Sequence, residues 1–175
     1  MKKYDLIREG KLFRIIALKD FGFIKKGELG GVVENRNNLG QQGNCWIHEN
    51  AKVLGNAEVS GNAQVLGDAE VTGNAKVYGN ALVSDDAKVT GNAKVYGNAY
   101  VLGNTQATKE VITFGNIFDY DITITDNHIK IGCQQYLKSR WLEFTNKEIL
   151  EMGGKRALKF WGLFKPFAIN MGFFN

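Results

Sequence analysis

The middle of the chain repeats small and branched apolar residues among polar ones with a period of six. Valine recurs every six residues from Val53 to Val101, and an alanine lies two residues before each of these valines, from Ala51 to Ala99. Residues two apart in an extended chain point to the same side, so each alanine and valine face one interior. The residue between them, such as Lys52, points outward. The pattern predicts one short strand in every six residues.

Glycine and asparagine supply the bends between these strands. Each of the eleven units from Gly43 to Thr108 has Asn or Asp before its small residue, and a glycine comes first in nine units, Glu49 and Asp85 being the exceptions. Both residue types accept the backbone angles of tight turns. Three six-residue units form the three sides of a triangular coil of 18 residues. The eleven units therefore make under four coils, and at a spacing of about 4.8 Å between coils the stack is roughly 18 Å tall. We expect the Asn side chains to stack in ladders.

The unit G-N-A-x-V-x resembles the hexapeptide repeat of left-handed parallel β-helix proteins, best known from acyltransferases. The left hand is implied by this resemblance and not by spacing, because most crossovers between parallel strands are right-handed. A calcium-binding nonapeptide solenoid would need a G-G-x-G-x-D pattern, which is absent. The expected fold class is an all-β solenoid of under four coils, with an N-terminal β cap and a C-terminal β-hairpin plus short helices.

Residues 1–42 precede the repeat and are expected to form the N-terminal β cap. A cap is required because an open solenoid end exposes apolar surface and unpaired strand edges. Tyr4–Glu9 and Leu12–Leu18 flank a Gly-Lys pair and predict a β-hairpin. The glycine-rich stretch Lys25–Gly31 predicts turns.

Residues 109–175 follow the β-helix of residues 43–108 and lose the period of six. Ile122–Thr125 and His128–Ile131 alternate in polarity around a turn, which predicts a second hairpin. Thr145–Glu148 has the form of a capping box.

The capping box predicts a short helix that stops at Gly153-Gly154. The last 23 residues contain four basic residues, many aromatic ones and no acid. We expect a basic amphipathic helix, broken near Pro166. It is expected to pack on the solenoid or on a second subunit, and attachment to a membrane surface is the alternative.

Segments at the edges of the repeat resemble a narrower group within the hexapeptide-repeat proteins. Lys25–Gly31 together with Gly43–Trp46 is similar to hexapeptide-repeat proteins common in bacteriophages and prophages. Members of that group tend to end in a hairpin carrying I-G-C-Q, here Ile131–Gln134, followed by a tryptophan, here Trp141. They are usually labelled as transferases by fold alone, and a fold does not fix a function.

Composition restricts the cellular setting and the partners. The net charge of +4 permits an anionic partner but gives no strong nucleic-acid signal. The start of the chain lacks the apolar core of a secretory signal, and no apolar run is long enough for a transmembrane helix. Cys45 and Cys133 are too few for a disulfide framework, and no metal-ligand spacing appears. We expect the cytoplasm of a bacterial host cell.

One of the three outward faces is almost uncharged. An apolar stripe of this size rarely stays in water. It is expected to be a subunit interface or to lie beneath the C-terminal segment, and the resemblance implies a homotrimer. The expected interface residues are Trp46, His48, Leu66, Leu82, Tyr100 and Leu102.

A second face places two tyrosines beside two lysines. Such a set can stack on an aromatic ring and hold a phosphate, which predicts a site for an anionic, nucleotide-like ligand. Cross-strand stacking on a solvated face is the alternative. The residues of this Tyr/Lys face are Lys76, Tyr78, Lys94 and Tyr96.

Catalysis has only two candidate general bases, His48 and His128. In acyltransferases of the resembling family, a histidine activates the acceptor and acyl-coenzyme A lies between subunits. Neither histidine here matches a catalytic motif. The alternative for His48 is an interface residue without chemistry, and the alternative for His128 is an exposed turn residue.

Because catalytic residues are scarce, we expect a non-catalytic oligomeric binding or structural module without a cofactor. It would present a rigid surface to a host protein, including one of a defence system, or to a small anionic ligand. The alternative is an O- or N-acyltransferase that uses acetyl-coenzyme A or another acyl-coenzyme A.

Overall fold

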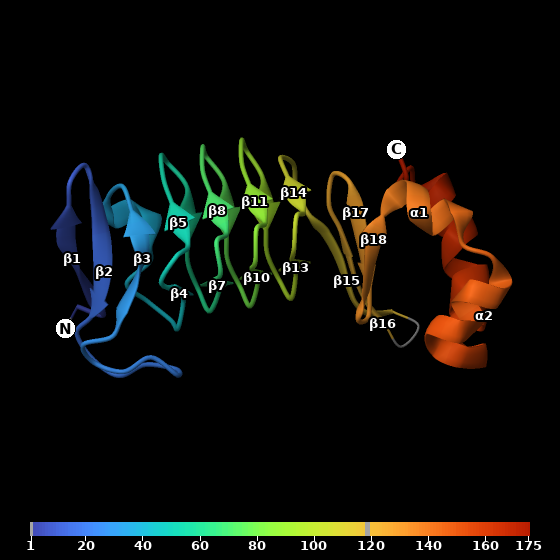
Figure 1. The fold of residues 1–175 in the computed structure, drawn as a ribbon, viewed down its shortest axis with the longest axis horizontal. Coiled ribbons are helices and arrows are strands. Elements are labelled where there is room, and N and C mark those ends of the chain that lie inside the picture. Colours follow the sequence, from blue (N-terminus) through green and yellow to red (C-terminus); the bar gives the residue numbers. More distant parts are fainter. Residues whose placement is uncertain (1, 118–119) are drawn as a thin grey trace.

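The computed structural model describes residues 2–117 and 120–175, and its central part is a parallel β-solenoid (Figure 1). An antiparallel element precedes the solenoid, and a four-stranded antiparallel sheet with two helices follows it. The molecule is elongated, with its N- and C-terminal parts at opposite ends (Figure 1).

Eleven two-residue strands build the solenoid, one for each six-residue unit. Each begins at an outward residue and ends at an inward one. They are β4 (Trp46–Ile47), β5 (Lys52–Val53), β6 (Glu58–Val59), β7 (Gln64–Val65), β8 (Glu70–Val71), β9 (Lys76–Val77), β10 (Leu82–Val83), β11 (Lys88–Val89), β12 (Lys94–Val95), β13 (Tyr100–Val101) and β14 (Gln106–Ala107).

From β7 to β14, each strand stacks on the strand three positions earlier in the chain. The resulting stacks have the orders β5-β8-β11-β14, β4-β7-β10-β13 and β6-β9-β12. Partners are 18 residues apart, as Val53 and Val71 are, which confirms the predicted coil length. Amides of one coil donate to carbonyls of the next, for example from Leu82 N to Ala99 O at 2.9 Å. The hand of the coil stays a prediction.

The corners are as closely packed as the interior. An ideal Cβ on Gly79, which has φ of 73°, would lie 2.9 Å from the amide nitrogen of Gly97 in the next coil. Asn ladders form at two corners, as expected; one runs from Asn56 through Asn74 to Asn92 with Nδ2 to Oδ1 distances of 3.1 Å. The repeated valines and alanines are completely buried.

The N-terminal element contains the predicted hairpin, β1 (Tyr4–Glu9) and β2 (Leu12–Ala17). β3 (Leu29–Val33) pairs antiparallel with β2 and parallel with β5, so it continues a sheet of the solenoid. The expectation of turns throughout Lys25–Gly31 is therefore wrong for its last three residues. A Cβ on Gly30 would lie 2.5 Å from the Ile47 carbonyl oxygen, so the missing side chain lets this strand pack closely on the first coil.

Buried polar groups fasten this element to the first coil. The fully buried Lys3 ammonium donates to the carbonyl oxygen of Cys45 at 3.0 Å and contacts its Sγ at 3.1 Å. Tyr4 Oη donates to the Leu39 carbonyl at 2.6 Å, and burial raises the pKa of this hydroxyl. A 3-10 helix, η1 (Arg36–Asn38), follows β3.

The C-terminal part has a separate core made largely of aromatic side chains. Its sheet has the order β15-β16-β17-β18, with β15 (Ile112–Ile117), β16 (Tyr120–Ile124), β17 (His128–Ile131) and β18 (Gln134–Leu137). The predicted hairpin is confirmed as β16 and β17. The helices are α1 (Lys138–Glu143) and α2 (Asn146–Asn170).

Helix α2 begins with the predicted capping box, in which Glu148 N donates to Thr145 Oγ1. Gly153 and Gly154 have non-helical backbone angles and kink it, as expected. The expected break near Pro166 is wrong, because the helix continues through this residue. Proline removes one backbone hydrogen bond, and the buried side chains of Phe164 and Ala168 hold the segment on the aromatic core.

Candidate functional site

The uncharged face of the solenoid, formed by β4, β7, β10 and β13, is covered by the chain itself at its N-terminal end. Trp46, expected at a subunit interface, is completely buried. Phe21 packs edge-on against its ring, with 5.4 Å between ring centroids. The cover therefore comes from the loop between β2 and β3 and not from the C-terminal segment, and Trp46 offers no surface to a second subunit.

That loop contains a hydrogen-bonded turn that presents a single phenylalanine. Phe21 and Ile24 exchange two backbone hydrogen bonds, of 3.1 and 2.9 Å, around Gly22 and Phe23. The Ile24 side chain is buried, whereas Phe23 is 100% exposed, the most exposed large apolar side chain among the described residues. Two anchored neighbours thus hold an apolar ring in solvent, where a folded chain gains nothing from it.

A groove of about 460 Å³ lies between this turn and the uncharged face. We call it the apolar groove. Leu66 and Leu82, both half-buried, lie on the solenoid side, and Phe23 lies on the other. Its lining residues are Gly22, Phe23, Ile24, Asn44, His48, Asn62, Gln64, Leu66 and Leu82.

The C-terminal end of the uncharged face is also partly covered. Lys130 of β17 places its Nζ 4.7 Å from the centre of the Tyr100 ring. Gln135 Nε2 donates to the Leu102 carbonyl oxygen at 2.8 Å. The two expected interface residues nearest the C-terminal sheet therefore have contacts within the chain, and Leu66 and Leu82 remain as the accessible centre of the face.

His48 lies beside the apolar groove in a defined hydrogen-bond network. Gln64 Nε2 donates to the carbonyl oxygens of Asn44 and Asn62, at 2.8 and 3.2 Å. Its Oε1 is consequently the acceptor, and it lies 3.0 Å from His48 Nε2. The neutral imidazole therefore carries its proton on Nε2, which leaves Nδ1 as a basic nitrogen without a hydrogen-bond partner among the described residues.

His128 lies in a different environment. It is half-buried in the C-terminal hairpin, where Nδ1 is 2.9 Å from Asn127 Oδ1 and the backbone amide donates to Thr125 Oγ1. Burial lowers the pKa of its imidazole. The ring lies in the other core-forming part of the molecule, so the structure does not bring the two histidines together.

The two tyrosines of the Tyr/Lys face stack on each other, as the cross-strand alternative expects. The rings of Tyr78 and Tyr96 are stacked, 5.3 Å apart and 11° from parallel, and Lys76 and Lys94 are strand partners. Tyr96 Oη also donates to Glu110 at 2.7 Å, which raises the pKa of this hydroxyl.

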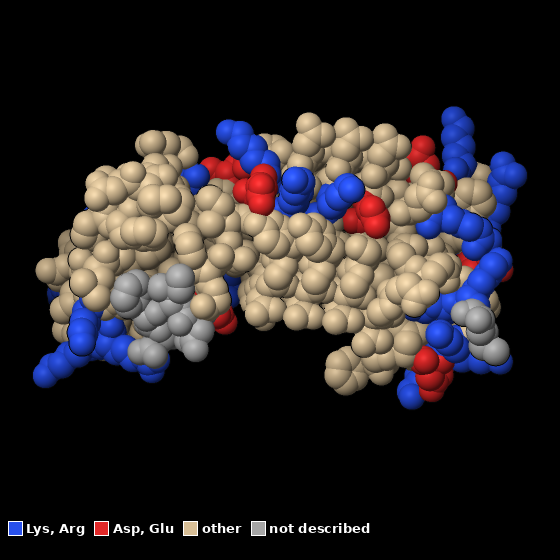
Figure 2. All heavy atoms as spheres, turned by 180° about the vertical axis from the view of Figure 1, so that it is seen from behind, with Lys and Arg blue, Asp and Glu red and all other residues tan. Residues whose placement is uncertain are grey.

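Acidic residues extend the Tyr/Lys face at both ends. Glu58 is the strand partner of Lys76 at one end, and Glu110 is paired with Lys94 by an isolated backbone β-bridge at the other. Charges of both signs thus share one band along the solenoid (Figure 2). An anion bound here would meet carboxylates as well as ammonium groups, which weakens its attraction.

The chain matches no protein-family model and no curated protein. Among residues 2–117 and 120–175, no three His, Cys, Asp or Glu side chains are grouped to hold a metal ion. In the same residues no helix combines the length and the hydrophobicity needed to cross a bilayer. The candidate sites therefore rest on geometry alone.

The sequence interpretation did not single out Phe23. The repeat makes the solenoid faces predictable, but a turn outside the repeat has no such period. A signal was present in Asp20–Phe23, where two phenylalanines flank a glycine in a polar stretch. The glycine between them indicates a turn, but it does not indicate which of the two rings is buried.

Proposed function

We propose that this protein is a non-catalytic scaffold that assembles as a homotrimer through its uncharged face. The observation that carries the proposal is the fully exposed Phe23, held on a hydrogen-bonded turn beside the apolar groove. In the trimer, Phe23 of one chain packs against Leu66 and Leu82 of its neighbour. The trimeric number follows the hexapeptide-repeat resemblance.

Energetics support assembly through this face. Burying a phenylalanine side chain contributes about 1.5–3 kcal/mol, and each of three interfaces buries one. His48 and Gln64 already satisfy one another by hydrogen bonding, and among the described residues no Lys, Arg, Asp or Glu lines the groove. Little charge must therefore be removed from water when the chains associate.

Assembly through this face leaves the Tyr/Lys face outward, because it belongs to another side of the prism. We propose this second face as the contact for a host protein. A small anionic, nucleotide-like ligand is the alternative, which the flanking carboxylates of Glu58 and Glu110 disfavour. From the phage and prophage resemblance we infer that the protein acts in the cytoplasm of an infected bacterium, and we propose evasion of a defence system as its purpose.

Assembly is tested by light scattering coupled to size-exclusion chromatography. Phe23→Ser and the double change Leu66→Asp with Leu82→Asp are expected to give monomers with unchanged circular dichroism. Leu163→Ser is the matched control, because Leu163 is 53% exposed on α2, far from the groove. A trimer that survives both groove variants would refute this interface, and so would a Leu163→Ser variant that dissociates equally.

One observation favours a second function, acyl-coenzyme A-dependent O- or N-acyl transfer. His48 has its Nε2 on Gln64 and no hydrogen-bond partner for Nδ1 among the described residues, and it lies next to the apolar groove, where a general base would be needed. Calorimetric titration with acetyl-coenzyme A distinguishes the two functions. The scaffold predicts no binding, whereas micromolar binding that is lost in His48→Gln would replace the scaffold by the transferase.

A further inference from the structure

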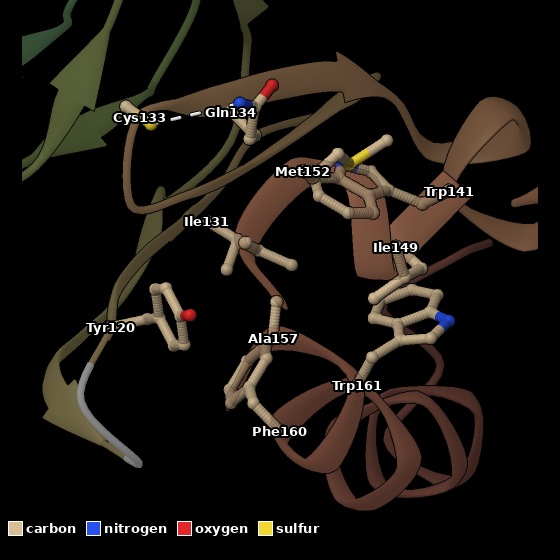
Figure 3. Close-up of a pocket in the computed structure, with 11 residues that line it drawn as sticks. Tyr120, Ile131, Cys133, Gln134, Trp141, Ile149, Met152, Ala157, Phe160 and Trp161 are labelled. Carbon is tan, nitrogen blue, oxygen red and sulfur yellow. Dashed lines mark hydrogen bonds between the residues drawn. The ribbon is translucent and has the colours of Figure 1, made fainter. Parts of the chain in front are cut away.

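A separate pocket opens in the C-terminal part, between the sheet and the two helices (Figure 3). Tyr120 and Ile131 line it from the sheet, and Met152, Phe160 and Trp161 line it from α2. Its volume is about 70 Å³, and it is partly open to solvent. Cys133 and Gln134 line it at the turn from β17 to β18 (Figure 3).

The kink of α2 is what leaves this space open. Gly153 lines the pocket without a side chain, and an ideal Cβ there would lie 2.8 Å from the Ala157 Cβ and 3.6 Å from the Tyr120 hydroxyl. Ala157, the next lining residue along the helix, is also small. The two smallest lining residues, Gly153 and Ala157, therefore share the pocket with large aromatic side chains.

One polar group of the pocket lining is a tyrosine hydroxyl. The Tyr120 hydroxyl points toward Ile131 and Ala157 (Figure 3), and among the described residues it has no hydrogen-bond partner, so it is available to a guest. Neighbours of the Tyr120 ring are Phe160 at 4.8 Å and the Arg156 guanidinium at 5.7 Å.

Size and lining select the ligand. The pocket, at about 70 Å³, has roughly half the volume of an enclosed apolar cavity that accommodates benzene. Because it is open to solvent, it can take up a single ring that is enclosed only in part. Trp141, Trp161, Phe160 and Tyr120 offer rings for edge-to-face and offset contacts, which favour an aromatic guest over an alkyl one. The Tyr120 hydroxyl favours a guest with one hydrogen-bonding group.

We propose that this pocket is a binding site for a monocyclic aromatic molecule with a single hydrogen-bonding group, of the phenol class. The ring lies among Trp141, Phe160 and Trp161, and its polar group meets the Tyr120 hydroxyl. The site is independent of trimer assembly, since none of its lining residues belongs to the apolar groove.

The test uses the three tryptophans as reporters in a proton–nitrogen correlation spectrum of the full chain. Phenol is expected to shift the indole signals of Trp141 and Trp161 in a saturable way. Trp46 belongs to the solenoid core and serves as an internal control whose signal stays in place. Toluene, which lacks the hydroxyl, is expected to bind about 2- to 12-fold more weakly, the value of one net hydrogen bond.

Two variants assign the effect to the pocket. Ala157→Leu fills the space and is expected to abolish the shifts with both probes. Tyr120→Phe keeps the ring and its contact with Phe160, so toluene binds as before and phenol loses its advantage. If Ala157→Leu disturbs the fold, the isosteric Tyr120→Phe comparison still decides.

The proposal is overturned if neither probe gives saturable shifts at Trp141 and Trp161, or if phenol keeps its advantage in Tyr120→Phe. Equal shifts at Trp46 would also overturn it, because they indicate nonspecific binding.

Discussion

The solenoid and the C-terminal part use opposite ways of filling a core. The solenoid interior consists of valines and alanines stacked coil on coil, and each backbone corner rests on the next. The C-terminal core consists mainly of large aromatic side chains between a sheet and two helices. Identical small units fill space completely, whereas few large rings leave a pocket between them.

This difference determines where function can reside. The inward positions of the solenoid are all occupied by packing, so its chemistry is limited to outward faces and to the loop that covers Trp46. The C-terminal part can hold a small ligand inside. Three predictions, from the largest effect to the smallest, sharpen this contrast.

The first prediction separates the two cores by truncation. Phe164→Ala is expected to cost about 3–5 kcal/mol of unfolding free energy, because a buried aromatic leaves a cavity. Val77→Ala removes two buried methyl groups and costs about 2–3 kcal/mol. Urea unfolding is followed by tryptophan fluorescence and by circular dichroism of the β-structure.

In Phe164→Ala the fluorescence change that comes from Trp141 and Trp161 moves to lower urea, while the change that comes from Trp46 in the solenoid core stays near its original midpoint. Coincident shifts of both signals would show one cooperative unit and contradict the separation of the cores.

The second prediction concerns the stacking of corners. Gly79→Ala and Gly103→Ala place the same side chain at the same repeat position, with φ of 73° and 61°. Both incur about 1 kcal/mol of left-handed strain. Gly79 additionally meets the Gly97 backbone at 2.9 Å, whereas the nearest atom to a Cβ on Gly103 is the Gln135 side-chain nitrogen at 3.7 Å.

Gly79→Ala is therefore expected to cost about 1–3 kcal/mol more than Gly103→Ala in thermal or urea unfolding. Equal losses would mean that turn strain, and not contact between coils, limits these positions.

The third prediction is a mild acid sensitivity confined to the C-terminal part. Burial lowers the pKa of folded His128 below its ordinary value of 6.5. The unfolded state therefore binds a proton first as the pH falls, so the stabilisation is complete above about pH 6.5 and is lost below it. The pKa of Glu148 is lowered to about 2, so the stability that this carboxylate contributes begins to be lost only when the pH falls below its ordinary value of 4.5.

The protection factors of amides in β16 and β17, which are corrected for the intrinsic exchange rate, are expected to fall between about pH 6.5 and pH 5, while those in β8 and β11 stay constant. In His128→Gln this fall disappears. Persistence of the effect in that variant would assign it to another group.

Much of the fold could be predicted because the repeat is periodic. Val53 to Val101 mark the interior, and the Gly-Asn pairs mark every corner, so coil length, register and Asn ladders all follow. The capping box at Thr145 and the kink at Gly153 rest on local chemistry that single residues reveal. The predicted helix break at Pro166 was wrong, because the packing of its neighbours Phe164 and Ala168 outweighs one missing backbone hydrogen bond.

The candidate sites were less predictable. Their geometry depends on contacts between segments distant in sequence, such as Phe21 on Trp46 and Lys130 on Tyr100. No period relates these segments. The pocket likewise depends on how α2 kinks over the sheet, and Tyr120 carries no sequence signal for its unpartnered hydroxyl.

The most direct test of the scaffold account is the mass of the unaltered protein by sedimentation equilibrium at micromolar concentrations. The account predicts a single species of three times the 19.5 kDa of one chain. A species of 19.5 kDa that persists as concentration rises would contradict it, because Phe23 and the apolar groove would then remain in water.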